Sequence, residues 1–267
     1  MLPEISASKV AGLIGLHKYQ EPNTVLYELL CKNKEIKTRI RAIESEHCRK
    51  PYEYVVADVM REQCVRDIIE MGLKAVTLTQ DVPRVMDEIE TNARVALDLR
   101  FDQYPAEVRT MLAGEVRGQV SKQRGIRNEH VILNQYEEDR GVQVVERNTK
   151  MCRKTYKTFR LVGRTDGFVA SENRIVDSKD RTRFFESVPL YDEIQLRCYM
   201  DMTGVTESEL VERFPDGRTR HTKFLNDPEK WKSIEEALER AVKRYTAAVE
   251  DPETLKQIVF ANTVSVK

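Results

Sequence analysis

Two aspartates lie near each other in a stretch that is typical of a β-hairpin. Residues 142–179 alternate between apolar and polar side chains and are rich in β-branched and aromatic residues, as strands are. Within them, Val169-Ala-Ser-Glu-Asn-Arg174 has the composition of a connection between two strands. If residues 170–173 form the turn, Asp166 falls directly opposite Asp177, with Cβ atoms ~5 Å apart. Like charges at that separation repel, so such a pair persists when a cation lies between them or one carboxyl holds a proton.

Lys179 adds a cation to this pair. Strand side chains alternate, so Lys179 points to the same face as Asp177. Two acids and a lysine on one face suit metal-assisted hydrolysis of a phosphodiester: the acids hold Mg²⁺, and the lysine orients the attacking water or neutralises the developing charge. A plain salt bridge between Lys179 and the acids is the structural alternative.

Glu129 is a candidate third acid. On a helix it shares a face with Ile126, Ile132, Leu133 and Tyr136. A carboxylate within an apolar stripe loses hydration at a cost of several kcal/mol unless a metal or a basic group pairs with it. The alternative is that Glu129 lies at the edge of the stripe and reaches water.

Gln195 repeats this pattern on a second helix, expected over residues 189–203. It shares a helix face with Tyr191, Cys198, Tyr199 and Met202. A buried amide needs hydrogen-bond partners, so Gln195 could order a water or a phosphate, or could cap a buried strand.

The segment 147–183 is strongly basic in a protein that is neutral overall. It holds eleven Lys and Arg residues against four acids, a charge of +7. Arg153, Lys154 and Lys157 lie in its middle. Such a run fits a track along a phosphate backbone, because those contacts come mainly from Arg and Lys, or else a solvated strand face.

The elements that must position these residues form an α+β pattern. Residues 23–120 have helical periodicity, with breaks expected at Gly72, Pro83 and Pro105. A second hairpin is expected around residues 215–217, and a long helix begins after Asp227, an N-cap followed by proline. The residues after Asp251 have no clear pattern.

Composition narrows the classes of function. The chain has 267 residues with 44 basic and 44 acidic side chains, and no apolar run approaches the ~20 residues of a membrane helix. Five scattered cysteines predict an intracellular, reducing compartment and free thiols. The four histidines lack zinc-ligand spacing, and there is no phosphate-binding Gly-x-x-x-x-Gly-Lys loop.

Taken in order, these motifs resemble those of a nuclease family. Gly163-Arg-Thr-Asp166-Gly167 and then Asp177-Ser-Lys179 are similar to the PD-(D/E)xK nuclease motif. Three further matches narrow the resemblance to the lambda-exonuclease-like, YqaJ-type viral recombinase nucleases: Ile5-Ser-Ala-Ser8-Lys9-Val10 with Gly12-Leu-Ile-Gly-Leu16, Arg124-Gly125-x-x-x-Glu129, and Tyr191-x-x-x-Gln195-x-x-x-Tyr199-Met200. The matches cover residues 5–16 and about 123–245.

The resemblance implies a role for each matching residue. It implies a restriction-endonuclease-like core, a mostly antiparallel mixed sheet flanked by helices, with a helical insertion over residues 23–120 and a catalytic core over residues 121–250 of a single domain. The implied metal ligands are Glu129, Asp166 and Asp177, with Lys179 catalytic and Gln195 assisting. The implied DNA and 5′-phosphate contacts are Ser8, Lys9, Arg164, Arg153, Lys154 and Lys157.

The chain also departs from the family pattern. Asp177 replaces the commoner glutamate, and Thr165 replaces the proline before the motif aspartate. The family has an arginine several residues before the serine that meets the 5′-phosphate, and here Met1 comes too late to supply it; Lys9 or Arg164 could replace it. Residues 23–120 are also a longer insertion than the phage enzyme has.

We therefore expect a Mg²⁺-dependent 5′→3′ exonuclease that acts on double-stranded DNA ends and leaves 3′ overhangs, with Mn²⁺ able to replace Mg²⁺. The family further implies a single-strand annealing protein as partner and a ring-shaped trimer. Two alternatives stay open: a structure-selective endonuclease on the same core, and a nucleic-acid-binding scaffold without catalysis.

Overall fold

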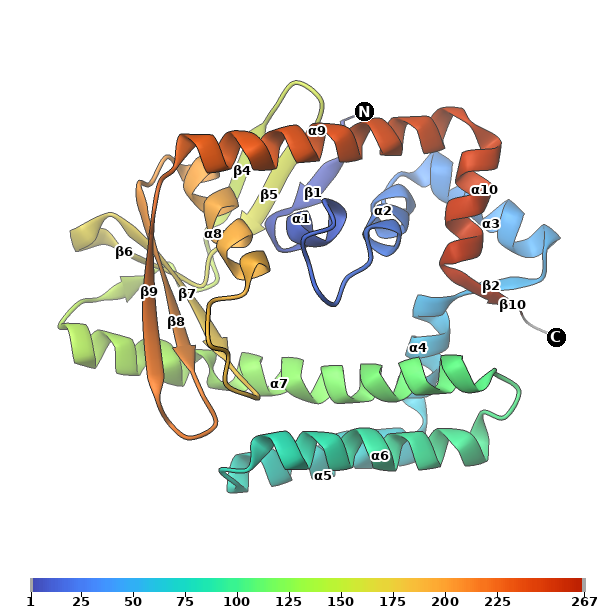
Figure 1. The fold of residues 1–267 in the computed structure, drawn as a ribbon, viewed down its shortest axis with the longest axis horizontal. Coiled ribbons are helices and arrows are strands. Elements are labelled where there is room, and N and C mark those ends of the chain that lie inside the picture. Colours follow the sequence, from blue (N-terminus) through green and yellow to red (C-terminus); the bar gives the residue numbers. More distant parts are fainter. Residues whose placement is uncertain (1, 266–267) are drawn as a thin grey trace.

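A five-stranded mixed sheet, at one end of the molecule's long axis, carries the hairpin (Figure 1). In the order in which they pair, its strands are β3 (Val144–Val145), β6 (Gly167–Val169), β7 (Arg174–Asp180), β8 (Glu207–Arg213) and β9 (Thr219–Leu225). The computed structural model describes residues 2–265. β7 and β8 are parallel, whereas the other neighbours are antiparallel. A parallel pair needs a crossover, which α8 (Leu190–Thr203) supplies.

Two small sheets join segments that are far apart in the sequence. β1 (Glu4–Ser6) runs parallel to β5 (Arg160–Arg164), which is antiparallel to β4 (Met151–Thr155). β2 (Arg49–Pro51) pairs with β10 (Thr263–Ser265) near the end of the chain. Arg49 reinforces this pair by donating to the hydroxyl and the carbonyl of Thr263, each at 2.6 Å. The first sheet thus fixes the start of the chain beside the strand that precedes Asp166.

Helices make up most of the remaining chain, and several begin at side-chain caps. The backbone N–H groups of Glu35 and Ile36 donate to the Asn33 side chain, and Asp227 and Asp251 each cap a helix whose first residue is proline. Besides α8, the helices are α1 (Ala7–Leu13), α2 (Pro22–Cys31), α3 (Lys34–Glu46), α4 (Tyr52–Arg61), α5 (Gln63–Leu78), α6 (Val82–Arg100), α7 (Ala106–Arg140), α9 (Pro228–Glu250) and α10 (Pro252–Ala261), with a short 3₁₀ turn, η1 (Ala170–Glu172).

The long helix α7 belongs to two hydrophobic cores. Its first half packs with α4, α5 and α6 through residues such as Leu112 and Val116. Its second half covers the large sheet through Ile132, Leu133 and Tyr136. Figure 1 shows α7 passing from the α5–α6 pair to the sheet without interruption. The expected boundary between residues 120 and 121 falls inside this helix, so the division into insertion and core stays a proposal.

The structure confirms the α+β class and the register of the hairpin. Gly167 pairs with Val176, Phe168 with Ile175, and Val169 with Arg174, as the turn residues predict. The second hairpin and the helices over residues 190–203 and from residue 228 are also as predicted. Within residues 2–265, no helix is both long and apolar enough to cross a membrane.

Two expectations about the helices were wrong. Gly72 does not break a helix but lies inside α5, where a Cβ would come 2.7 Å from Ile89 Cδ1. Its role is close packing between α5 and α6. The residues after Asp251 are not featureless, since they form α10 and β10.

Candidate active site

The hairpin brings Asp166 and Asp177 together, as its register requires. Asp166 directly precedes β6 and Asp177 lies within β7, opposite one another at the end of the ladder. One oxygen of Asp166, Oδ2, accepts from the backbone N–H of Ser178 at 2.8 Å and from its hydroxyl at 3.3 Å. Burial, with a contribution from the charge of Glu129, raises the pKa of Asp166. The backbone of the hairpin therefore holds the two carboxyl groups close together, and the folded protein is less stable when both are ionised.

Lys179 compensates part of this negative charge. Its Nζ lies 2.6 Å from Oδ2 of Asp177, whose side chain is almost fully buried. Burial opposes the charged form of Lys179, but the charges of Asp177 and Asp166 raise its pKa above the ordinary value, so the amine stays protonated. Burial and then Asp166 raise the pKa of Asp177 to about 7. The other oxygen of Asp177, Oδ1, is buried without a hydrogen-bond partner.

Glu129 reaches the pair indirectly. The side-chain amide of Asn148 donates to Glu129 Oε1, and the backbone N–H of Asn148 donates to the carbonyl of Asp166 at 3.2 Å. Asn148 has the left-handed φ of 51°, which asparagine tolerates better than most residues. Sequence patterns did not identify Asn148. The expected apolar stripe around Glu129 is incomplete, because Ile126 is 64% exposed and Glu129 is only half-buried.

A buried ion network fixes α7 against β7. Asp180, whose carboxylate is fully buried, lies 3.1 Å from Arg124 and 3.3 Å from Arg213. It also accepts from the amide of Asn128 at 2.6 Å, and Arg124 donates to the carbonyl of Arg181 at 2.9 Å. Asn128 and Asp180 are the chain neighbours of Glu129 and Lys179. The network therefore sets how far the predicted acid on the helix lies from the lysine on the strand.

Gln195 and Tyr199 close the site from α8. Gln195 donates to the hydroxyl of Tyr199 at 2.9 Å, and that hydroxyl donates to the carbonyl of Arg164 at 2.8 Å. Burial, followed by the charge of Asp177, raises the pKa of Tyr199, so the phenol keeps its proton. A Cβ at Gly163 would lie 2.5 Å from the Tyr199 ring, which explains why the motif has glycine at this position. The Arg164 side chain is exposed.

The side chains fit a divalent cation in part. Asp177 Oδ1 is an oxygen ligand without a partner, and Asp166 lies across from it, which is the hard-oxygen donor set that Mg²⁺ prefers. In the part of the chain that the structure describes, no three His, Cys, Asp or Glu side chains gather tightly enough to form a metal centre. Glu129 would have to exchange its contact with Asn148 to become the third ligand.

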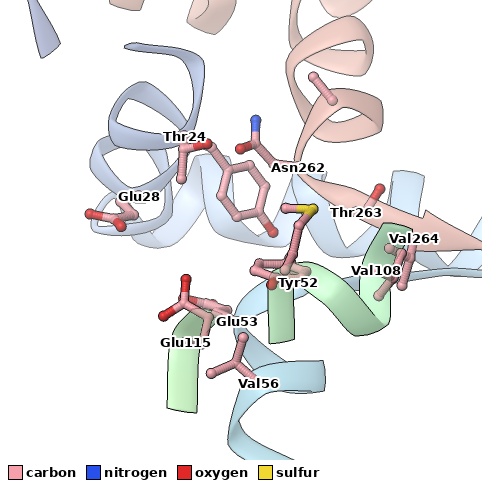
Figure 2. Close-up of a pocket in the computed structure, with 13 residues that line it drawn as sticks. Thr24, Glu28, Tyr52, Glu53, Val56, Val108, Glu115, Asn262, Thr263 and Val264 are labelled. Carbon is pink, nitrogen blue, oxygen red and sulfur yellow. The ribbon is translucent and has the colours of Figure 1, made fainter. Parts of the chain in front are cut away.

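Ser8 and Lys9 lie at the first turn of α1. Ser8 is exposed, and its hydroxyl is 3.1 Å from that of Ser6, while Ser6 makes no side-chain cap. Lys9 Nζ lies 2.8 Å from Glu28 of α2. Glu28 lines a cavity of about 420 Å³ between α2, α4, α7 and the C-terminal segment, shown in Figure 2. None of the predicted site residues lines that cavity, so the chemistry predicted here does not lie in it.

Most of the predicted basic track takes part in ion pairs. Lys154 lies 3.0 Å from both carboxylate oxygens of Asp201, and Arg174 is buried among acids of the sheet. Arg153 and Lys157 are exposed, and within residues 2–265 neither has a carboxylate partner. Of Arg153, Lys154 and Lys157, it is therefore Arg153 and Lys157 whose charges are available to contact DNA phosphates.

Comparison with known proteins rests on structure alone. No family model and no curated protein matches the sequence. An alkaline exonuclease from Laribacter hongkongensis, LHK-Exo, superposes with a TM-score of 0.51 at 14% sequence identity, over 97% of this chain and 95% of the other. The chain has the fold of this alkaline exonuclease. That result confirms the fold class and, as a likeness of fold, the resemblance to lambda-exonuclease-like nucleases.

Two further solved structures are similar over part of the chain. A phage-related exonuclease from Haemophilus somnus 129PT has a TM-score of 0.41 and 17% identity, over 49% of this chain and 72% of its own. LHK-Exo in complex with dAMP has a TM-score of 0.41 and 17% identity, over 63% and 92%. The full-length alkaline exonuclease match therefore carries the comparison.

Proposed function

We propose that this protein is a Mg²⁺-dependent 5′→3′ exonuclease that degrades double-stranded DNA from its ends and leaves 3′ single-stranded overhangs. One observation carries the proposal: Asp177 combines a lysine on one carboxylate oxygen with a buried, unpartnered second oxygen, at the hairpin position opposite Asp166. An isolated buried carboxylate oxygen is costly, and a cation relieves that cost. The alkaline exonuclease fold supports the nuclease interpretation.

In this proposal Asp166, Asp177 and Glu129 hold the cation. A bound Mg²⁺, or Mn²⁺ in its place, would polarise the scissile phosphate and lower the pKa of an attacking water. Lys179 stays protonated beside Asp177, so it stabilises negative charge that develops on the phosphate. Gln195 orients Tyr199, and that phenol fixes the backbone on which Arg164 presents its exposed guanidinium to the DNA.

Two alternatives are separated by one assay. Linear and covalently closed circular duplexes are incubated with Mg²⁺ or with EDTA, and Lys179→Ala serves as the inactive control. The proposal expects loss of the linear DNA only, only with metal, and not with Lys179→Ala. Cutting of circles supports the structure-selective endonuclease, and binding without cutting supports the nucleic-acid-binding scaffold. Either result contradicts the proposal.

Assembly and partners belong to the same proposal. The 3′ overhang is the substrate of a single-strand annealing protein, which makes such a protein the proposed partner. The resemblance also supports a ring-shaped homotrimer that encloses DNA. Light scattering coupled to size exclusion tests the trimer, and a monomer that digests long duplexes without dissociating would contradict it.

A further inference from the structure

Aromatic and basic side chains gather where two loops meet beside the candidate active site. One loop, residues 14–21, joins α1 to α2, and the other, residues 181–189, joins β7 to α8 (Figure 1). Tyr19 is 56% exposed, and the rings of His17 and Tyr191, which it contacts, are half-buried. A contiguous exposed apolar surface marks a binding region. We call this region the loop surface; its members are His17, Lys18, Tyr19, Arg183 and Tyr191.

The rings of the loop surface are held in fixed orientations. His17 stacks on Tyr191 with centroids 4.3 Å apart and planes at 24°. Tyr19 meets Tyr191 edge-on at 6.5 Å, and Arg183 donates to the Tyr19 hydroxyl and lies 6.0 Å from its ring centroid. Tyr19 therefore presents ring surface to solvent while its contacts to Tyr191 and Arg183 restrict its motion.

The loop surface continues directly from the site. Tyr191, Gln195 and Tyr199 are spaced by four residues on α8, so they share one face, with Tyr191 about 6 Å along the axis from Gln195. Arg183 follows Lys179 by four residues on the other side. Arg181, which lies between Lys179 and Arg183 in the chain, is 2.7 Å from Asp192, the chain neighbour of Tyr191, so the end of β7 and the start of α8 are in contact.

The charges of the loop surface indicate which class of ligand it binds. Lys18 and Arg183 are exposed and have no carboxylate partner within residues 2–265. Aromatic faces combined with unpaired cations bind single-stranded nucleic acid, since each base offers a π-face and each nucleotide a phosphate. Base-paired DNA hides those faces inside the duplex.

We propose that the loop surface stacks unpaired nucleobases at the DNA end next to the active site. This inference rests on the proposed exonuclease function, because it takes the site to act on DNA ends. The loop surface holds the bases of a frayed or tailed end while the backbone lies at Lys179, and Tyr19 is the main stacking ring.

The test measures binding without cleavage, in EDTA. Dissociation constants are compared for a blunt duplex and for the same duplex with a short unpaired 5′ tail that carries 2-aminopurine, whose emission falls on stacking. Tyr19→Ala should weaken binding of the tailed duplex roughly tenfold, the effect of losing about one stacked base, and should leave the blunt duplex within about twofold. Tyr19→Phe keeps the ring and should retain the tail affinity and the quenching.

The matched control is Tyr54→Ala, which removes a tyrosine of α4 that is 40% exposed and outside the loop surface. It should change neither duplex. The inference is overturned if Tyr19→Ala binds the tail as the unmodified protein does, if it weakens both duplexes equally, or if Tyr19→Phe fails as Tyr19→Ala does. Nuclease activity is scored separately with Mg²⁺: failure to digest linear DNA refutes the proposed function, and the EDTA binding data still decide the stacking surface.

Discussion

The buried network around Asp180 gives the most direct test of how the site is held. Asp180 lies against Arg124 and Arg213 and accepts from Asn128, so it ties α7 to β7. Asp180→Asn keeps the size of the side chain and removes its charge. The side chains of Arg124 and Arg213 are only 9% and 26% exposed, so their charges would be left without compensation in a poorly hydrated place.

The expected loss is large because one partner of a buried ion network disappears. Such changes cost about 3–5 kcal/mol in the free energy of unfolding. For a chain of this size that loss lowers Tm by roughly 6–15 °C. Urea unfolding followed by circular dichroism measures the free energy, and thermal scans measure Tm. Arg84→Ala is the matched control, since Arg84 is 61% exposed in its pairs and should cost less than about 1 kcal/mol.

A double-mutant cycle separates the network from a general loss of packing. Arg124→Met combined with Asp180→Asn should cost less than the sum of the single changes by about 1–3 kcal/mol, because each change already removes the shared contact. Asp180→Asn should also weaken Mg²⁺ binding, since Glu129 would no longer be fixed relative to the strand. Additive losses, or a loss below about 1 kcal/mol for Asp180→Asn, would refute the reasoning.

Three further predictions concern the acid pair, the basic side chains and the DNA end. The metal-free protein should lose stability as the pH rises from about 4 through about 7, because the unfolded carboxyl ionises near 3.8 while burial holds the folded pKa of Asp177 at about 7. Thermal scans should show this loss, and Mg²⁺ should stabilise more at pH 8 than at pH 6. Asp177→Asn should reduce both effects and leave the part of the pH dependence that comes from Asp166, whose pKa burial also raises. Arg153→Ala with Lys157→Ala should flatten the salt dependence of duplex binding by about two units of slope, measured by titration, while Lys154→Ala should change it less; an altered sequence preference would contradict backbone contact. A 5′-phosphorylated duplex should be digested faster than a 5′-hydroxyl duplex, and Ser8→Ala should shrink that difference; equal rates for both ends in the unmodified protein would exclude a phosphate pocket at α1.

The hairpin could be predicted because its information is local. The turn residues 170–173 and the alternation on either side fix the register, and the register alone places Asp166 opposite Asp177. The helix after Asp227 could be predicted for the same reason, since its cap and proline precede a regular apolar stripe. The same cap and proline at Asp251 and Pro252 announce α10, a signal that the sequence interpretation passed over.

The remaining features depend on pairings between distant segments. Glu4 of β1 pairs with Arg160 of β5, and no local pattern in either segment specifies the other. Asn148 links Glu129 to Asp166 from a turn in which Glu146 and Asn148 have left-handed backbone conformations. No sequence motif marks this turn. Ile126 was expected to be buried from helical periodicity, but it lies outside both cores that α7 joins. Periodicity predicts which face is apolar, not where along a long helix that face is covered.

The continuity of α7 gives the molecule a mechanical property. Its 35 residues form a rod about 50 Å long, anchored at one end by α5 and α6 and at the other by the sheet. Glu129 is six residues, about 9 Å, from the midpoint, so a tilt of about 6° around the midpoint moves it by roughly 1 Å, and a displacement of that size at a reacting centre can cost about a hundredfold in rate. Glu129 lies on the sheet-side half of this lever. In the proposed exonuclease, a ligand or subunit that binds the α5–α6 pair and tilts α7 would therefore change the rate of DNA cleavage without contacting the DNA or the metal.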